Sequence, residues 1–169
     1  MSLPAFDPLG LIGVLNEHGV RFVVIGGIAA GVQGVVWATT DLDICHGRTR
    51  KDYDALAEAL VDLQARPAGV PVDVTVKLDP PALRRGDWWS FATRLGKLDC
   101  LGEPAPGIDY EFLAPRSRHI EGSHTYRVAT LADIIAMKEE ASRAKDRAHL
   151  ELLRAAERLA GGSNPKPRR

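Results

Sequence analysis

The sequence predicts an α/β fold: a small mixed β-sheet with helices packed on it and further helices at the C-terminus. The first observation is an apolar segment at 20–25 that leads through Gly26-Gly27 into a short helical segment and a second strand. The second is a hairpin pattern around Leu95-Gly96. The third is the helical spacing of apolar residues in the segments around these strands. Strands and helices that alternate in this way pack as a sheet covered by helices.

Capping residues and glycines set the expected limits of the elements in the first half of the chain. Asp7 caps a helix that begins at the proline after it, and Thr49 caps one that begins near Arg50. Runs of β-branched and apolar residues predict buried strands. The predicted elements are a helix from Pro8 to Gly19, a strand at 20–25, a short helix closed by Gly34, a strand at 35–45 and a helix that ends before Pro67.

The second half carries one strand pattern that is hard to place. PVDVTVK at 71–77 alternates apolar and polar residues like a strand, and Asp79-Pro80-Pro81 ends it. Residues 82–89 form either a helical turn or a loop. The other predicted elements are the hairpin at 91–101, a helical turn at 110–114, a strand at 125–129, a helix from Leu131 to about Ser142 capped by Thr130 with Asp133, and a last helix at 146–160.

Length and composition suit one globular domain. The chain has 169 residues, of which 45% are hydrophobic and 26% charged, close to the average for globular domains. We expect a single domain over residues 1–160 and a disordered tail at 161–169. Lys plus Arg and Asp plus Glu both number 22, so no global positive field draws the chain to nucleic acid or to an anionic membrane.

The sequence shows neither a targeting signal nor a zinc-type cysteine pattern. The N-terminus lacks a basic region followed by a long apolar segment, and no segment approaches the roughly 20 apolar residues of a membrane span. We therefore expect a cytoplasmic protein without membrane contact. Cys45 and Cys100 form no CxxC pair and are expected to be buried thiols. The five histidines show no ligand spacing, so none is assigned to a metal.

Two aspartates in the second predicted strand carry the first chemical signal. Because side chains alternate between the faces of a strand, Asp41 and Asp43 point to one side, while Leu42 and Ile44 point into the core. Two carboxylates so close together repel each other unless a cation compensates their charge. A hard cation with oxygen ligands, magnesium above all, fits such a pair.

The glycine pair Gly26-Gly27 precedes Asp41 with thirteen residues between them. Without Cβ atoms, the backbone of this pair can approach a ligand closely, and the N–H groups of the helix that follows face an anion. A plain tight turn is the structural alternative. The glycine turn after one strand and the aspartates on the next together predict a phosphate-binding loop beside a metal site.

These motifs resemble the signature of the polymerase-β-like nucleotidyltransferase superfamily, a glycine turn followed by a D-x-D/E strand flanked by apolar residues. Within that superfamily the chain is most similar to small prokaryotic proteins of the AbiEii type, from about residue 20 to 150. The matching stretches are Gly26-Gly27-Ile28-Ala29, Thr39-Thr40-Asp41-Leu42-Asp43, Gly96-Lys97-Leu98-Asp99, Ile135-Ala136-Met137-Lys138 and Arg143-Ala144-Lys145-Asp146. The resemblance implies a nucleotidyltransferase fold.

The resemblance also implies a role for each matched side chain. Asp99 would be the third carboxylate, which assists metal binding and accepts the proton of the attacking hydroxyl, and Asp73 is its rival. Lys138 would reach the phosphates, or else form a salt bridge at a solvated helix end. The implied catalytic residues are Asp41, Asp43, Asp99 and Lys138; the first three of these are the implied metal ligands. The implied nucleotide-binding residues are Gly26, Gly27, Thr39, Lys138 and Lys145.

By the same resemblance the chain is a nucleotidyltransferase that uses two Mg²⁺ ions to move a nucleoside monophosphate from an NTP to a hydroxyl, with release of pyrophosphate. The acceptor would be RNA, in particular tRNA, or a protein. The resemblance further implies a toxin–antitoxin system with a cognate toxin or antitoxin as partner. The alternative is a non-catalytic nucleotide-binding module, or a regulatory partner protein with a degenerate site.

One departure from the family supports that alternative. Trp37 stands where the family commonly has arginine, two residues before the motif threonine; it either stacks on a base or fills core, and the core is the expected place. The pair Trp88-Trp89 offers the same choice between stacking on a base and packing under a loop, with packing expected. A basic cluster just past the aspartates either meets phosphates or lines the start of a helix: Arg48, Arg50 and Lys51.

Overall fold

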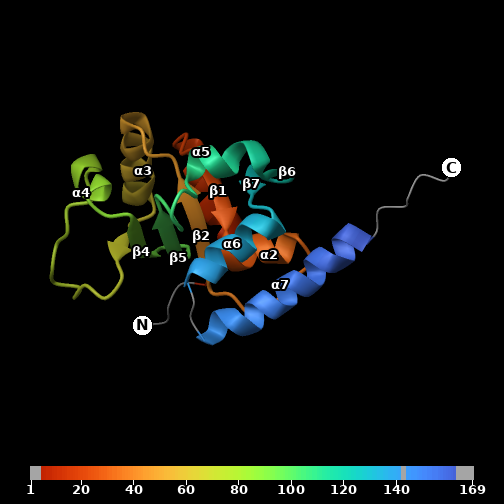
Figure 1. The fold of residues 1–169 in the computed structure, drawn as a ribbon. Helices are drawn as coiled ribbons and strands as arrows, with labels where there is room; N and C mark the ends of the chain where they lie inside the picture. The colour runs from red at the N-terminus through yellow and green to blue at the C-terminus, as the bar shows by residue number, and fades with distance from the viewer. Residues whose placement is uncertain (1–4, 142–143, 163–169) are drawn as a thin grey trace.

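The computed structural model describes residues 5–141 and 144–162, which form a seven-stranded mixed sheet with helices packed on it (Figure 1). The strand order is β3-β4-β5-β2-β1-β7-β6. β1 runs parallel to β7 and β2 runs parallel to β5, while the other neighbouring strands are antiparallel. The predicted α/β class with a mixed sheet is confirmed.

The elements alternate along the chain as the predicted class requires. The strands are β1 (Phe22–Ile25), β2 (Asp41–His46), β3 (Arg66–Pro67), β4 (Trp88–Thr93), β5 (Gly96–Leu101), β6 (Arg118–Ile120) and β7 (Tyr126–Val128). The helices are α1 (Pro8–Glu17), α2 (Gly26–Val32), α3 (Arg50–Asp62), α4 (Pro80–Arg84), α5 (Tyr110–Leu113), the short 3₁₀ turn Ala114–Arg116, α6 (Leu131–Ala141) and α7 (Ala144–Gly162).

The core lies around the central strands β5, β2 and β1. All residues of β1 are buried, as expected for a strand covered on both faces. On β2, Leu42 and Ile44 are fully buried, whereas Asp41 and Asp43 on the opposite side are only partly covered. α1 packs against β2 and β5, while α2 packs on β1 and β2 and contacts α6, which in turn contacts α7 (Figure 1). The packed centre thus fixes the strands from which the two aspartates project.

Side-chain caps place the helix starts where the sequence predicts them. The Asp7 carboxylate accepts a hydrogen bond from the Gly10 amide at 2.9 Å and caps α1. Thr49 and Asp52 form a reciprocal capping box at α3, which satisfies two amide groups that the helix leaves open. Thr130 accepts from the Asp133 amide at 3.2 Å at the start of α6. These local signals need no tertiary context, so sequence alone identifies them.

The hairpin of β4 and β5 is confirmed, but two predicted strands differ from the structure and two observed strands were not predicted. The predicted strand at 35–45 is confined to β2, because Val36 before it is 82% exposed and meets no neighbouring strand. Residues 71–77 form no strand, so that prediction is wrong. β3 and β6 were not predicted, since strands of two and three residues give no periodic pattern.

The uncertain segment at 82–89 divides between a helix and a strand. Asp79 caps α4 through the Ala82 amide at 2.9 Å, with Pro80 in the first turn.

At the C-terminal end of the chain, α7 starts at Ala144 and continues to Gly162. Residues 163–169, which belong to the predicted tail, lie outside the described residues. Among the helices that the structure describes, none combines the length and apolar character needed to cross a membrane.

Candidate metal and nucleotide site

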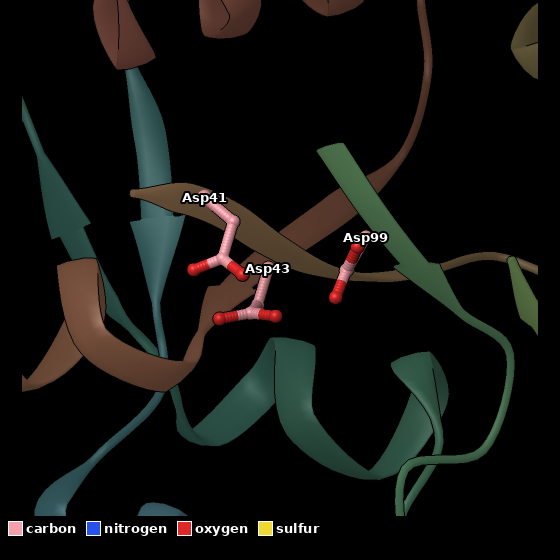
Figure 2. Close-up of side chains that lie close together, drawn as sticks. All are labelled: Asp41, Asp43 and Asp99. Atoms are coloured by element: carbon pink, nitrogen blue, oxygen red, sulfur yellow. The ribbon is translucent and has the colours of Figure 1, made fainter. Parts of the chain in front are cut away.

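Three carboxylates meet on one face of the sheet, at the pairing of β2 with β5. The two strands run parallel with Asp43 beside Asp99 and Asp41 beside Lys97. Because residues two apart on a strand share a face, this register puts Asp41, Asp43 and Asp99 together. One oxygen from each of the three carboxylates lies within 4.8 Å of the others (Figure 2).

Burial and mutual repulsion act most strongly on the central carboxylate. Burial, together with the charges of Asp41 and Asp99, raises the pKa of Asp43 to about 7. The ammonium groups of Lys97 and Lys138 act in the opposite direction and lower this pKa, but they do not outweigh burial. The cluster therefore carries more negative charge at neutral pH than the nearby lysines compensate, which favours either a proton or a further cation.

Lys97 is the cation nearest to the cluster, and the sequence reasoning did not select it. Its Nζ lies 3.0 Å from Asp41 Oδ2 and 3.5 Å from Asp99 Oδ2. Burial alone would lower the pKa of Lys97, but the hydrogen bond to Asp41 and the charge of Asp99 outweigh burial and raise it. Its position two residues before Asp99 on a strand was the available signal, since that spacing places both side chains on one face.

Two hydroxyl groups orient the outer carboxylates. Thr39 Oγ1 donates to Asp41 Oδ1 at 3.0 Å, and Ser90 Oγ on β4 donates to Asp99 Oδ1 at 2.5 Å. Thr39 was predicted as a nucleotide-binding residue. Ser90 was missed, and only the pairing of β4 with β5, which sets Ser90 opposite Asp99, brings it to the site.

The glycine turn is required by the position of the aspartates. Gly26 has φ of +64°, a left-handed conformation that side chains other than glycine rarely adopt. A Cβ at Gly26 would lie 2.1 Å from Asp43 Oδ2, and one at Gly27 would lie 2.9 Å from Thr39 Cβ. The turn therefore leaves the space that the Asp43 carboxylate occupies, and its backbone borders the carboxylate cluster directly.

The carboxylates line a cleft of about 680 Å³ between the sheet and helices α6 and α7. Of the predicted site residues, those that line it are Gly26, Gly27, Thr39, Asp41, Asp43, Asp99 and Lys138. Lys145 lies in the first turn of α7, and Arg143 falls outside the described residues, so the structure describes neither side chain.

The helical wall of the cleft carries contacts that the sequence did not predict. Trp37 is partly buried and lines the cleft, with its ring stacked on that of His149 at 4.1 Å between centroids. Trp37 also packs against the hydrophobic core, as expected, so it serves both the core and the wall of the cleft. Lys138 Nζ lies 5.3 Å from the centroid of the Trp37 ring and 3.1 Å from Asp146 Oδ1. Lys138 thus both lines the cleft and forms the salt bridge considered as its structural role.

Most other candidates lie away from the carboxylates, and Trp88 lies on the rim of the same cleft. Asp73 is exposed on the segment between β3 and α4 and is not part of the cluster. Arg48 pairs with Glu103 at 3.0 Å and with Asp87 at 3.4 Å. Trp89 packs inward, where its Nε1 donates to the Leu83 carbonyl at 3.1 Å. The remaining candidates are the exposed Arg50 and Lys51, the half-exposed Trp88 on the rim of the cleft, and the buried free thiols Cys45 and Cys100.

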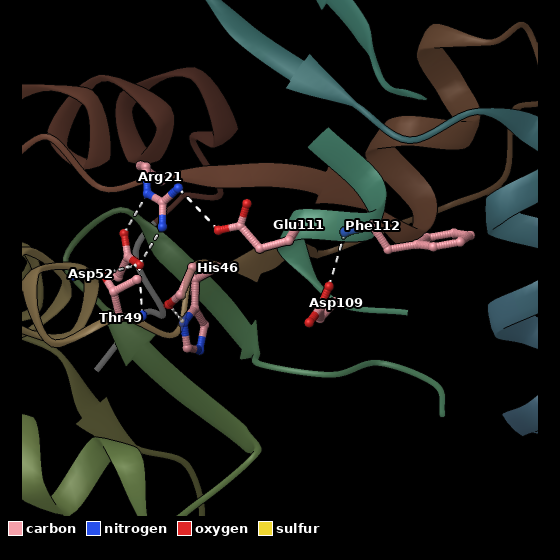
Figure 3. Close-up of polar contacts among 8 residues, drawn as sticks. Arg21, His46, Thr49, Asp52, Asp109, Glu111 and Phe112 are labelled. Carbon is pink, nitrogen blue, oxygen red and sulfur yellow. Dashed lines mark hydrogen bonds and ion pairs between the residues drawn. The ribbon is translucent and has the colours of Figure 1, made fainter. Parts of the chain in front are cut away.

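A second polar cluster lies at the other end of β1 (Figure 3). Arg21 donates to both oxygens of the buried Asp52 at 2.8 and 2.7 Å, and Thr49 donates to the same carboxylate. Burial opposes ionisation of Asp52, but the hydrogen bonds from Arg21 and Thr49 outweigh burial and lower its pKa to about 2. Every oxygen of this carboxylate has a partner, so the cluster holds α3 to the sheet and offers no open ligand position.

The comparisons with known proteins bear on the fold. No protein-family model matches the chain, and no curated protein matches it in sequence. Among solved structures, the chain is similar to a protein from Thermotoga maritima described as a "putative nucleotidyltransferase", with a TM-score of 0.53 and 15% sequence identity. The match covers 85% of this chain and 87% of that one. The chain therefore has a nucleotidyltransferase fold, and its acidic triad is a candidate metal site within that fold.

The Arg21–Asp52 pair should stabilise the fold in a pH-dependent way. We expect Asp52→Ala to lower the free energy of unfolding by roughly 2–3 kcal/mol at pH 7, because it removes the carboxylate that accepts hydrogen bonds from Arg21 and from the Thr49 amide. The pKa of Asp52 is lower in the folded state, so its contribution is complete above about pH 4 and is lost as the pH falls towards about 2. Urea unfolding at pH 7 and pH 2.5 measures both effects.

Asp54→Ala is the matched control, because Asp54 lies on the same helix and is exposed. Equal losses of stability for Asp52→Ala and Asp54→Ala would contradict a specific role for the buried pair.

Ionisation of Asp43 should lower the stability of the metal-free protein, whereas ionisation of Asp52 raises it. The pKa of Asp43 is about 7 in the fold, against 3.8 in the free side chain, so the contribution of Asp43 to stability is largest below about pH 4 and is lost as the pH rises through about 7. Asp43→Asn removes the repelling charge, and we expect it to raise the free energy of unfolding by roughly 2 kcal/mol at pH 8 without added metal, and to change it little at about pH 4. Thermal unfolding in the presence of a chelator measures the difference.

Asp73→Asn provides the control for a carboxylate outside the cluster. If Asp43→Asn changes the free energy of unfolding to the same extent at about pH 4 and at pH 8, charge repulsion is not what limits the stability of the site.

Proposed function

We propose that this protein is a metal-dependent nucleotidyltransferase, which moves a nucleoside monophosphate from an NTP to a hydroxyl group. The observation that supports the proposal is the convergence of Asp41, Asp43 and Asp99 within 4.8 Å on the wall of a cleft, in a chain with a nucleotidyltransferase fold. A structural role alone does not explain three carboxylates whose mutual repulsion the nearby lysines compensate only in part.

The donor set fits magnesium. Carboxylate oxygens are the ligands that Mg²⁺ prefers, and the excess negative charge at Asp43 is the charge that a divalent cation would neutralise. Asp41, Asp43 and Asp99 would hold the two ions of our proposal. When bound, the ions would supply positive charge to the phosphates and to the attacking oxygen.

The walls of the cleft suit a nucleotide. Its volume of about 680 Å³ lies within the range of sites for small ligands. We propose that the triphosphate lies between the backbone of Gly26-Gly27 and the ammonium of Lys138, with Thr39 beside it. Lys145 is proposed as a further phosphate contact from the start of α7. The side chains of Trp37 and His149 line the same cleft and offer aromatic surface to the base.

The reaction proposed for this site is an in-line displacement at the α-phosphorus. The acceptor oxygen forms a bond to the α-phosphorus while the bond from that phosphorus to the bridging oxygen of the β-phosphate breaks, and pyrophosphate leaves. The proton of the acceptor hydroxyl passes to Asp99. Ser90 Oγ donates to the other oxygen of this carboxylate and so orients it towards the cleft. The part of the protein is mainly to position these groups.

The acceptor is proposed as RNA, in particular tRNA, or a protein, within a toxin–antitoxin system that includes a cognate partner. This part of the proposal rests on the resemblance of the sequence motifs to the AbiEii type. The chain carries equal numbers of acidic and basic residues, so any contact with RNA phosphates must come from a local surface.

A nucleotide-binding module without turnover is the second candidate, and two contacts favour it. Trp37 replaces the arginine common in the resembled family and stacks on His149. Lys138, the proposed phosphate contact, is held by Asp146 at 3.1 Å. The replacement of arginine by Trp37 and the salt bridge of Lys138 both reduce the positive charge available in the cleft, which weakens stabilisation of a transition state rich in negative charge.

Label transfer separates the two candidates. The protein is incubated with Mg²⁺ and each α-labelled NTP, with total tRNA or cell lysate as the acceptor. We expect labelled product from one NTP, and we expect Asp43→Ala to lower the rate by at least about a hundredfold because a metal ligand is lost. Asp73→Ala, outside the cluster, should retain full activity.

The same samples are tested for thermal stabilisation by Mg²⁺ with NTP. Stabilisation without label transfer to any acceptor favours the binding module. If neither Mg²⁺ nor any NTP raises the melting temperature of the wild-type protein, both candidates are wrong.

Lys97 should compete with the metal for the same oxygens. Because its ammonium lies 3.0 Å from Asp41 and 3.5 Å from Asp99, we expect Lys97→Met to tighten Mg²⁺ binding about tenfold, since one positive charge leaves the site. Calorimetric titration with Mg²⁺ measures the affinity, and Lys51→Met, at an exposed position on α3, is the control. Weaker binding by Lys97→Met would indicate that Lys97 positions the carboxylates rather than competing for them.

A further inference from the structure

The segment from Val72 to Leu78, between β3 and α4, has the pattern of a strand but no strand structure. In Figure 1 it forms the yellow-green loop that stands out from the sheet. Three valines alternate with polar residues along it: Val72, Val74 and Val76 are 82%, 46% and 36% exposed. Alternating β-branched residues are typical of strands with one covered face. Here that face remains in contact with solvent.

The backbone of the segment also makes few hydrogen bonds within the described residues. Of the amide groups from Val72 to Leu78, only that of Val74 donates a backbone hydrogen bond within the described chain, to the Pro71 carbonyl at 3.0 Å. Arg66 donates to the carbonyls of Pro71 and Val72 at the start of the segment. An exposed run of unpaired amides and carbonyls with β-branched side chains is a template for another strand.

The order of the residues is complementary to itself. When two copies of the segment are laid antiparallel with Thr75 opposite Thr75, Asp73 of each copy faces Lys77 of the other. On the opposite face, Val74 meets Val76. This register places opposite charges together and apolar residues together, and each such pair favours association.

Neighbouring registers lack this match. A shift that sets Val76 opposite Val76 places Asp73 opposite Asp79, and one that sets Asp73 opposite itself also opposes two carboxylates. The register centred on Val74 opposes Asp73 with Thr75 and forms no ion pair. Shifts by one residue bring the valines against polar side chains. Only the register centred on Thr75 satisfies both faces.

We propose that residues 72–78 are an interaction surface for a second copy of this chain, with which they form an antiparallel two-stranded pair about a two-fold axis at Thr75. The turn closed by Pro71 and Val74 opens when the pair forms, and the new inter-strand hydrogen bonds replace its single bond. Lys77, which lies 2.8 Å from Asp79 in the monomer, then also meets Asp73 of the partner.

The flanking residues limit the length of the strand pairing. Pro71 before the segment and Pro80-Pro81 after it have no amide hydrogen, so the pairing cannot extend along the sequence. A two-fold contact of this kind closes on itself and does not propagate. A pair of seven-residue strands buries less surface than a standard interface, so we expect a dissociation constant on the order of micromolar.

Sedimentation velocity over about 1–500 µM protein tests the proposal, a range that brackets the expected affinity. The wild-type chain should pass from monomer to dimer. Lys77→Glu and Asp73→Lys each oppose like charges at two symmetric positions, and each should weaken the dimer about tenfold or more. The double variant, with both charges exchanged, restores the opposite pairing and should restore the dimer. A monomeric wild-type protein at every concentration would overturn the proposal.

Cross-linking tests the register. Only a residue on the two-fold axis faces its own copy, so Thr75→Cys should form a disulfide-linked dimer under mild oxidation. Val61→Cys, at a position that is 74% exposed on α3, is the control and should remain monomeric. Equal cross-linking of the two variants, or failure of the double charge exchange to restore a dimer lost in the single variants, would contradict the proposed pairing.

Discussion

The parallel pairing of β2 with β5 is the constraint on which the site depends. It fixes Asp43 beside Asp99 and Asp41 beside Lys97, so three carboxylates share one face whatever their mutual repulsion. The fully buried Leu42 and Leu98 on the other face hold this register, because a slip by one residue would send them to the polar side. Hydrophobic burial thus stabilises an arrangement of charges that opposes folding, which is typical of functional sites.

The groups around the carboxylates reduce the electrostatic repulsion among them but do not remove it. Lys97 spans the two outer carboxylates, and the hydroxyls of Thr39 and Ser90 satisfy one oxygen on each of them. Asp43, the central carboxylate, has a pKa raised to about 7. The structure therefore compensates the outer charges with its own groups and leaves the central one exposed to whatever enters the cleft.

The sequence predicts what depends on local chemistry and misses what depends on strand pairing. The caps at Asp7 and Thr49 and the hairpin of β4 and β5 follow from short-range patterns, and so does the shared face of Asp41 and Asp43. Asp99 could be chosen only through the motif resemblance, because nothing local indicates that β5 lies beside β2. Ser90 and the Trp37–His149 stack were missed because their partners lie on other elements.

Residues from both halves of the chain contact one another on the helical wall of the cleft. Trp37 follows α2, while His149 and Asp146 come from α7, and Lys138 of α6 contacts both Trp37 and Asp146. A cation held between an aromatic ring and a carboxylate is kept in one place at the cost of its availability to a ligand. A phosphate that reaches Lys138 must therefore share it with Asp146, so the position of α7 influences how strongly the cleft attracts a nucleotide.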